Sequence, residues 1–319
     1  MPRSPRPAGL LTATVTAVAL SLLAGTPAVA VAPPLSAPRI LVHLDLATGQ
    51  TPENIALEPD GSADVTFIGN STIARITPDG QVHVLAVLPV PDHPATPVVG
   101  FPALAGIVRA HDGTLYVNYS TGTADLTGVW RLRPGGTPER IVALPVDSLS
   151  NGLALDPRHG VLYAADSALG LVRRIPLHGG APTVWASGAE LQGTTFIGAN
   201  GIKVHHGAVW VSNTDRGSLL RIPIEEDGAA GPVEVRAHDI GPVDDFAFTG
   251  RGDEVLAALN VAHELALVRP DGTESIVLTR DDGLSNPTAV AVCGDTVYVT
   301  SAAFTTRQDP NLLLAHLDR

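Results

Sequence analysis

The residues best suited to chemistry in this chain carry carboxylate or carboxamide oxygens and recur at one position of a repeating pattern. Each stands two residues before a recurring apolar residue, at the entry of a predicted strand: Glu53, Asn151, Asn200 and Asp244. Ala105 and Thr288 occupy the same position in two further copies, and none of the six residues is basic. Converging oxygen ligands with a total charge of −2 suit a hard divalent cation. We expect calcium, with magnesium, manganese and zinc as alternatives.

Each of these residues also has an ordinary structural explanation. Asn151 and Asn200 both precede glycine, and Asn-Gly is a common turn dipeptide. Glu53 fits an exposed loop, and Asp244 fits one half of a solvated Asp-Asp pair. Their recurrence at one position favours a shared site over these separate explanations.

The elements that must position these residues form a repeat of short strands. The recurring apolar residue lies in the middle of a strand, and its copies are Ile55, Ile107, Leu153, Ile202, Phe246 and Val290. A turn, a second alternating strand and a third strand follow each copy. A period of this length that carries only strand patterns predicts a propeller, with four antiparallel strands in each blade.

A fourth strand follows the third in the first five copies but not in the last, because the chain ends at Arg319. Arg39 to Leu46 is a strand-like run without a place in the repeat, and it can fill that vacancy. We therefore predict an all-β, six-bladed β-propeller whose last blade is closed by the N-terminal strand. First strands line the central channel of a propeller, so the six recurring residues should surround one mouth of it.

The N-terminus has the pattern of a secretory signal peptide, which we place at residues 1–32. Two arginines precede an apolar segment from Leu10 to Leu23, and small residues follow it. Residues 33–38 are predicted to be a short linker and residues 39–319 the propeller domain. We expect a secreted protein that does not stay on the membrane after cleavage. Its formal charge of −12 argues against nucleic acid as a partner.

Long connections on a rigid scaffold are candidate walls for a substrate. They are Pro91 to Leu104, Gly188 to Ala199 and Ala302 to Asn311, and Phe196 in the second of them offers apolar contact. The His205-His206 pair precedes a glycine, and we interpret it as a turn between strands rather than as a metal site. Cys293 is the sole cysteine, which excludes a disulfide within the chain.

Several stretches resemble a known family across nearly the whole chain after the signal. They are P-E-N-I-A-L-E-P-D-G from Pro52, S-N-G-L-A-L-D-P from Ser150, A-N-G-I-K-V from Ala199 and D-D-F-A-F from Asp244. The sequence thereby resembles the senescence marker protein/gluconolactonase/luciferin-regenerating-enzyme-like family of six-bladed propellers. In that family a Glu of the first blade and an Asn and an Asp of two later blades hold one divalent metal.

The resemblance implies that Glu53, Asn200 and Asp244 are metal ligands and that Asn151 contacts the substrate. It also implies a lactone or a related ester as the small-molecule substrate. Family lactonases often have an arginine where this chain has Leu149.

Together these observations predict a metal-dependent hydrolase of the lactonase or esterase type, which we expect to be a monomer. Asp244 is the expected catalytic residue, because it can orient or deprotonate the attacking water. Two alternatives stay open. One is a non-catalytic propeller that binds a ligand or a protein, and the other is a metal-independent tailoring enzyme resembling strictosidine synthase.

Overall fold

The computed structural model describes residues 1–2, 4, 34–178 and 180–318. Apart from residues 1–2 and 4, the predicted signal peptide lies outside the described residues, and so does residue 33 of the predicted linker. Residues 33–319 form one compact unit. Among the described residues, no helix is long and apolar enough to cross a membrane.

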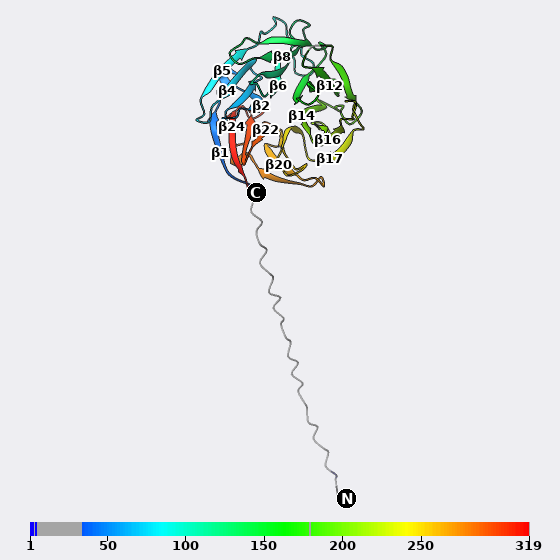
Figure 1. Ribbon diagram of the computed structural model, residues 1–319. Coiled ribbons are helices and arrows are strands. Elements are labelled where there is room, and N and C mark those ends of the chain that lie inside the picture. Colours follow the sequence, from blue (N-terminus) through cyan, green and yellow to red (C-terminus); the bar gives the residue numbers. More distant parts are fainter. Residues whose placement is uncertain (3, 5–33, 179, 319) are drawn as a thin grey trace. The chain divides into compact units, whose positions relative to one another are not determined.

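Six four-stranded antiparallel sheets surround a central axis (Figure 1), so the predicted six-bladed propeller is confirmed. Blade 1 contains β2 (Pro52–Leu57), β3 (Ala63–Phe67), β4 (Thr72–Ile76) and β5 (Val82–Val87); blade 2 contains β6 (Ala103–Arg109), β7 (Leu115–Ser120), β8 (Gly128–Leu132) and β9 (Glu139–Ala143); blade 3 contains β10 (Ser150–Asp156), β11 (Val161–Asp166), β12 (Leu171–Pro176) and β13 (Thr183–Ser187). Blade 4 contains β14 (Ala199–His205), β15 (Ala208–Asn213), β16 (Ser218–Pro223) and β17 (Glu234–Ala237); blade 5 contains β18 (Val243–Phe248), β19 (Val255–Leu259), β20 (Glu264–Val268) and β21 (Glu274–Leu278); blade 6 contains β22 (Pro287–Cys293), β23 (Thr296–Ser301), β24 (Asn311–Leu317) and β1 (Leu35–His43). Single 3-10 turns lie at Leu46–Thr48 and Arg280–Asp282.

The N-terminal strand closes the ring as predicted. β1 pairs antiparallel with β24, the last strand of the chain, and the two lie side by side in Figure 1. The strand begins at Leu35, inside the segment that the sequence analysis assigns to a linker. Leu35 is buried in the core of the last two blades and pairs with Leu317, which explains the earlier start. Two register shifts within β1 hide this pairing from a simple alternation pattern.

A β-bulge interrupts the innermost strand of every blade at the recurring position found in the sequence. In β18, for example, the register steps from Val243 to Phe246, and Asp244 and Asp245 together oppose one residue of β19. The same shift occurs in β2, β6, β10, β14 and β22. A bulge leaves residues without regular ladder partners and changes the direction of their side chains. The bulges therefore position the six recurring residues.

Hydrogen bonds between neighbouring blades hold the bulges together at all six interfaces. In each case a polar side chain near the end of one blade's inner strands donates to a backbone carbonyl beside or at the next bulge. These bonds are Thr66 to Ala105 O (2.7 Å), Asn118 to Asn151 O (2.9 Å), Ser167 to Ala199 O (2.7 Å), Ser212 to Asp244 O (2.8 Å), Asn260 to Pro287 O (3.2 Å) and Thr288 to Pro52 O (2.9 Å).

Candidate active site

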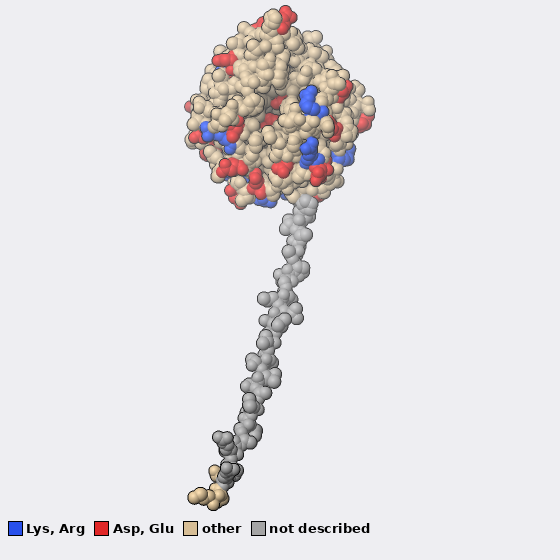
Figure 2. Space-filling view, turned by 180° about the vertical axis from the view of Figure 1, so that it is seen from behind, with Lys and Arg blue, Asp and Glu red and all other residues tan. Residues whose placement is uncertain are grey.

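A cavity of about 430 Å³ lies where the bulges of the inner strands meet. Five of the six recurring residues line it: Glu53, Ala105, Asn151, Asn200 and Asp244. Figure 2 shows a hollow in the middle of one face, with acidic atoms visible at its bottom. Thr288, the sixth recurring residue, is fully buried and does not line the cavity, because its hydroxyl is bonded to Pro52 O and to Thr300. The structure thus brings together all four predicted polar residues.

Asp244 is held in place by two side-chain amides. Nδ2 of Asn200 donates to Oδ1 of Asp244 at 2.8 Å, and Nδ2 of Asn260 donates to Oδ2 at 2.9 Å. Burial and, second, the neighbouring Asp245 carboxylate raise the pKa of Asp244 to about 7, although the two amide donors oppose this shift. The carboxyl group is thereby fixed in orientation and titrates near neutral pH.

Glu53 is buried and lacks a partner for one of its oxygens. Its Oε2 atom is shielded from solvent, and no group of the described residues donates a hydrogen bond to it. Burial, followed by the charges of Asp244 and Asp245, raises the pKa of Glu53 well above 4.5. Two acids therefore share a buried site with no cation in hydrogen-bond contact, an arrangement that is costly unless a proton or a metal ion compensates it.

Asp245 belongs to a separate network and is not part of the acidic pair. Lys203, the only lysine of the chain, contacts both of its oxygens at 2.6 and 2.7 Å, and Asn54 donates to it at 3.2 Å. This ion pair offsets part of the charge of Asp245, which still raises the pKa of Asp244 and of Glu53. No lysine, arginine or histidine of the described residues lines the cavity itself, so the acids at the mouth have no such counterion there.

Asn151 presents a free amide to the cavity. Its backbone carbonyl accepts from Asn118, but its side-chain amide forms no hydrogen bond within the described part of the chain. The side chain of Asn200, in contrast, is bonded to both Thr214 and Asp244. Of the two asparagines, Asn151 is the one with unused donors and an unused acceptor for a bound molecule.

Sequence reasoning missed Asn260, which orients Asp244 and lines the cavity. It follows the second strand of blade 5, and Asn213 and Asp166 stand at the ends of the second strands of blades 4 and 3. A polar residue thus recurs at the end of the second strand, and this recurrence could have identified Asn260 from the sequence.

Asp215 was also missed, although it shapes the wall that carries Phe196. Its Oδ2 accepts hydrogen bonds from the backbone N–H groups of Thr194, Thr195 and Phe196 at 2.6, 2.7 and 2.8 Å. Partial burial alone would raise the pKa of Asp215, but these bonds outweigh it and lower the pKa. The loop is therefore held by a charged side chain from the next turn of the same blade.

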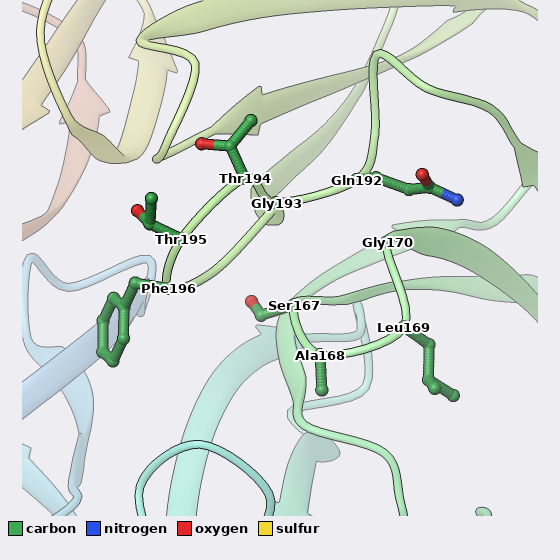
Figure 3. Close-up of a pocket in the computed structure, with 9 residues that line it drawn as sticks. All are labelled: Ser167, Ala168, Leu169, Gly170, Gln192, Gly193, Thr194, Thr195 and Phe196. Atoms are coloured by element: carbon green, nitrogen blue, oxygen red, sulfur yellow. The ribbon is translucent and has the colours of Figure 1, made fainter.

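Phe196 lines the cavity, as predicted, and it also borders a second hollow of about 410 Å³. Figure 3 shows this hollow between the turn Ser167–Gly170 and the loop 192–196, with the side chains of Phe196 and Gln192 at opposite ends of the loop. The second hollow contains no titratable side chain.

The predicted turn lies at His206 and Gly207, both at positive φ, directly after His205 at the end of β14. It lies at the opposite end of β14 from Asn200 and therefore away from the cavity. Asp253 approaches both rings, with contacts of 3.3 and 3.4 Å. Among the described residues this is the one group of three His, Cys, Asp or Glu side chains close enough to share a metal ion. Any metal measurement must separate it from the cavity.

The fold and the cavity define a six-bladed propeller with a buried acidic pair at one mouth of its channel. The sequence matches no protein-family model and no curated protein. Solved structures share the fold. A gluconolactonase from Xanthomonas campestris has a TM-score of 0.63 at 16% identity, covering 88% of this chain and 95% of that chain. A regucalcin from Agrobacterium tumefaciens, described as a calcium-binding protein, has a TM-score of 0.62 at 18% identity, covering 88% and 93%.

Virginiamycin B lyase from Staphylococcus aureus is also similar in fold, with a TM-score of 0.59 at 14% identity over 88% of this chain and 100% of that chain. The fold neighbours thus include gluconolactonase and regucalcin proteins, in agreement with the resemblance inferred from the sequence. They also include a lyase, so the structural similarity supports the architecture only, and the chemistry must be inferred from the residues of the site.

Proposed function

We propose that this protein is a metal-dependent hydrolase that opens a lactone or a related ester at the mouth of the propeller channel. The observation that carries the proposal is the buried pair Glu53 and Asp244, which has no cationic partner and lies beside two asparagines at the floor of the cavity.

The residues present fit a divalent cation. Glu53 has a buried oxygen without a hydrogen-bond partner, and Asp244 is close enough for its charge to raise the pKa of Glu53. Carboxylate and amide oxygens are the ligands of hard divalent cations, and calcium remains the ion we expect. Glu53, Asn200 and Asp244 would hold the ion. When bound, it would polarise the substrate carbonyl and stabilise the charge that develops on its oxygen.

The chain's own residues supply the remaining steps. The amides of Asn200 and Asn260 hold the Asp244 carboxylate so that it can orient a water molecule and accept a proton from it. The free amide of Asn151 can donate to an oxygen of the substrate. Phe196 and the other apolar walls limit the access of bulk water, which strengthens these polar interactions.

The test is hydrolysis of a panel of lactones and esters, in which the released carboxylic acid is measured. We expect turnover by the unmodified protein and a loss of at least about a hundredfold in Asp244→Asn, the size typical for removal of a general base. His206→Asn, which removes one side chain of the distant His-His-Asp group, should keep full activity. If no member of the panel is turned over, the protein is a binding platform; turnover that is insensitive to chelation would favour the metal-independent alternative.

We also propose secretion as a monomer. The basic residues and the apolar segment of residues 1–32 support export, and the ring is closed within one chain. N-terminal sequencing of protein from culture medium would test cleavage, which we expect near Ala30 or Ala32; a chain that keeps Met1 and remains with the cells would contradict it.

A further inference from the structure

The walls of the cavity are apolar on every side, in contrast to its floor. Each blade contributes at least one apolar side chain, among them Ile68, Phe101, Leu149, Phe196, Val261 and Phe304 for blades 1 to 6. These residues come from six separate connections with unrelated sequences, so one apolar loop does not account for the pattern. Four of them are substantially exposed, with relative exposures of 44% for Phe101, 57% for Phe196, 63% for Val261 and 36% for Phe304.

The distribution of phenylalanine points to the same surface. The chain has six phenylalanines. Phe67 and Phe246 are buried, and Phe248 packs against the core of blades 4 and 5. The remaining three, Phe101, Phe196 and Phe304, are exposed, and all three line this cavity. Exposed aromatic side chains that gather around one cavity mark a site for an apolar ligand.

The cavity offers an anionic ligand no side-chain counterion. No basic side chain of the described residues lines it, while Glu53 and Asp244 lie at its floor. Most of the polar groups lie there as well, namely Asn151, Asn200, Thr214 and Asn260, while Thr305 adds one hydroxyl next to Phe304. A polyhydroxylated molecule would therefore lose hydrogen bonds to water along walls that cannot replace them.

From this division into a polar floor and apolar walls we infer the substrate class, an inference that rests on the proposed function. The substrate is an uncharged lactone or ester that carries an alkyl or aryl substituent. Its ester group lies at the floor near Asp244 and Asn151, and the substituent packs against the phenylalanine-lined walls. The cavity of about 430 Å³ has the size of a site for a small organic molecule, for which about 300–1,000 Å³ is usual.

Hydrolysis of a chain-length series tests the inference. The probes are γ-butyrolactone and its γ-alkyl derivatives with ethyl, butyl, hexyl and octyl groups, compared with glucono-δ-lactone. Each added methylene should raise kcat/KM by about fourfold until the cavity is filled, the factor that corresponds to about 0.8 kcal/mol for a buried methylene. The gain should lie in KM, because the alkyl group is bound equally in the ground and transition states.

Two cavity variants and one matched control locate the effect. Phe101→Ser and Phe304→Ser should each flatten the dependence of kcat/KM on chain length. Val184→Ser removes an apolar side chain that is 53% exposed outside the cavity, and it should leave the dependence unchanged. Unaltered melting temperatures would show that the variants are folded.

Measurements of ligand binding distinguish a failure of this inference from a failure of the proposed function. γ-Alkyl lactams resist hydrolysis, and calorimetry should show that they bind more tightly as the chain lengthens, with a negative heat-capacity change. If lactams bind in this way and no lactone is turned over, the hydrolase proposal fails and the ligand class stands. If glucono-δ-lactone or γ-butyrolactone is turned over as well as the long-chain lactones, the hydrolase proposal stands and the apolar substrate class is overturned. Tighter binding of an alkylammonium ion than of the neutral lactam would also overturn it.

Discussion

Removing the proposed divalent cation should make the stability of the protein depend on pH in a particular direction, because two acids then share a buried site. The pKa of Asp244 is raised from 3.8 to about 7, and that of Glu53 is raised as well. Between pH 3.8 and about pH 7, the Asp244 carboxyl binds a proton in the folded state but not in the unfolded state. Its contribution to the free energy of unfolding is therefore fully present below pH 3.8 and is lost as pH rises through about 7.

The pKa change of Asp244 gives the size of this effect. A rise from 3.8 to about 7 corresponds to about 4 kcal/mol in total at about 1.4 kcal/mol per pKa unit. Of this, about 2–3 kcal/mol should be lost between pH 5 and pH 8, the range over which the folded-state group gives up its proton.

Urea unfolding at pH 5, 6, 7 and 8 in the presence of a chelator measures this loss, with Asp244→Asn as the reference. The variant carries no charge at this position, and it also removes the neighbouring charge that raises the pKa of Glu53. Its amide nitrogen replaces an oxygen that accepted a hydrogen bond from Asn200 or Asn260. The loss of that hydrogen bond lowers the stability equally at every pH, so it cancels when pH values are compared. The loss from pH 5 to pH 8 should be smaller in the variant by about 2–3 kcal/mol.

Adding a divalent cation at a hundredfold excess over its Kd should then raise the free energy of unfolding of the unmodified protein at pH 8 by about 2.7 kcal/mol. It should leave Asp244→Asn unchanged. If the chelated protein loses no more stability between pH 5 and pH 8 than the variant does, Asp244 does not titrate in the way described, and the argument for an uncompensated acidic pair is refuted.

Three further predictions follow from the fold and the cavity walls. A chain that starts at Ala47 lacks β1 and exposes the edge of β24, so it should aggregate or lose cooperative unfolding; an unchanged denaturant midpoint would show that β1 does not close the ring. In Gly152→Ala the new Cβ would lie 2.4 Å from the carbonyl oxygen of Asn200, and we expect a loss of about 1–3 kcal/mol in urea unfolding, whereas a neutral result would mean that the inner strands can move apart. Phe196→Ala should raise KM for an alkyl lactone by roughly fivefold, the effect of losing about 1 kcal/mol of apolar contact, without changing metal affinity; unaltered kinetics would remove the loop 188–199 from the substrate site.

The repeat made most of the fold predictable from the sequence. Alternating strands with turn residues between them recur six times, and the missing fourth strand of the last copy identifies the role of the N-terminal strand. The start of that strand was placed too late, because Pro38 and the register shifts of β1 obscure its alternation. Packing of Leu35 against the core overrides the local pattern.

The floor of the cavity was predictable because one position of the repeat supplies it. Glu53, Asn151, Asn200 and Asp244 share an offset from the first strand, and the bulge at that offset turns them into the same cavity. Thr288 shares the offset but is buried, and its hydroxyl donates to Pro52 O instead of facing the cavity. Sequence position alone therefore predicts one residue too many in the lining of the cavity.

The walls were predictable only in part, because the long connections that carry Phe101, Phe196 and Phe304 are recognisable in the sequence but their meeting around one cavity is not. Phe101, Val261 and Phe304 lie in connections of different length and at different points of their blades. No common spacing links them, and only the three-dimensional closure of the ring brings them together. Asn260 and Asp215 were missed for a related reason, because their roles depend on which backbone or side-chain groups the neighbouring turns present.

The measurement that tests the central claim most directly is the divalent metal content of the purified protein, determined by mass spectrometry beside that of two variants. We predict one equivalent of bound cation in the unmodified protein and in His206→Asn, and none in Asp244→Asn, because Asp244 belongs to the acidic pair and His206 to the distant group. A protein without stoichiometric metal, or a cation that is retained in Asp244→Asn and lost in His206→Asn, would contradict the account.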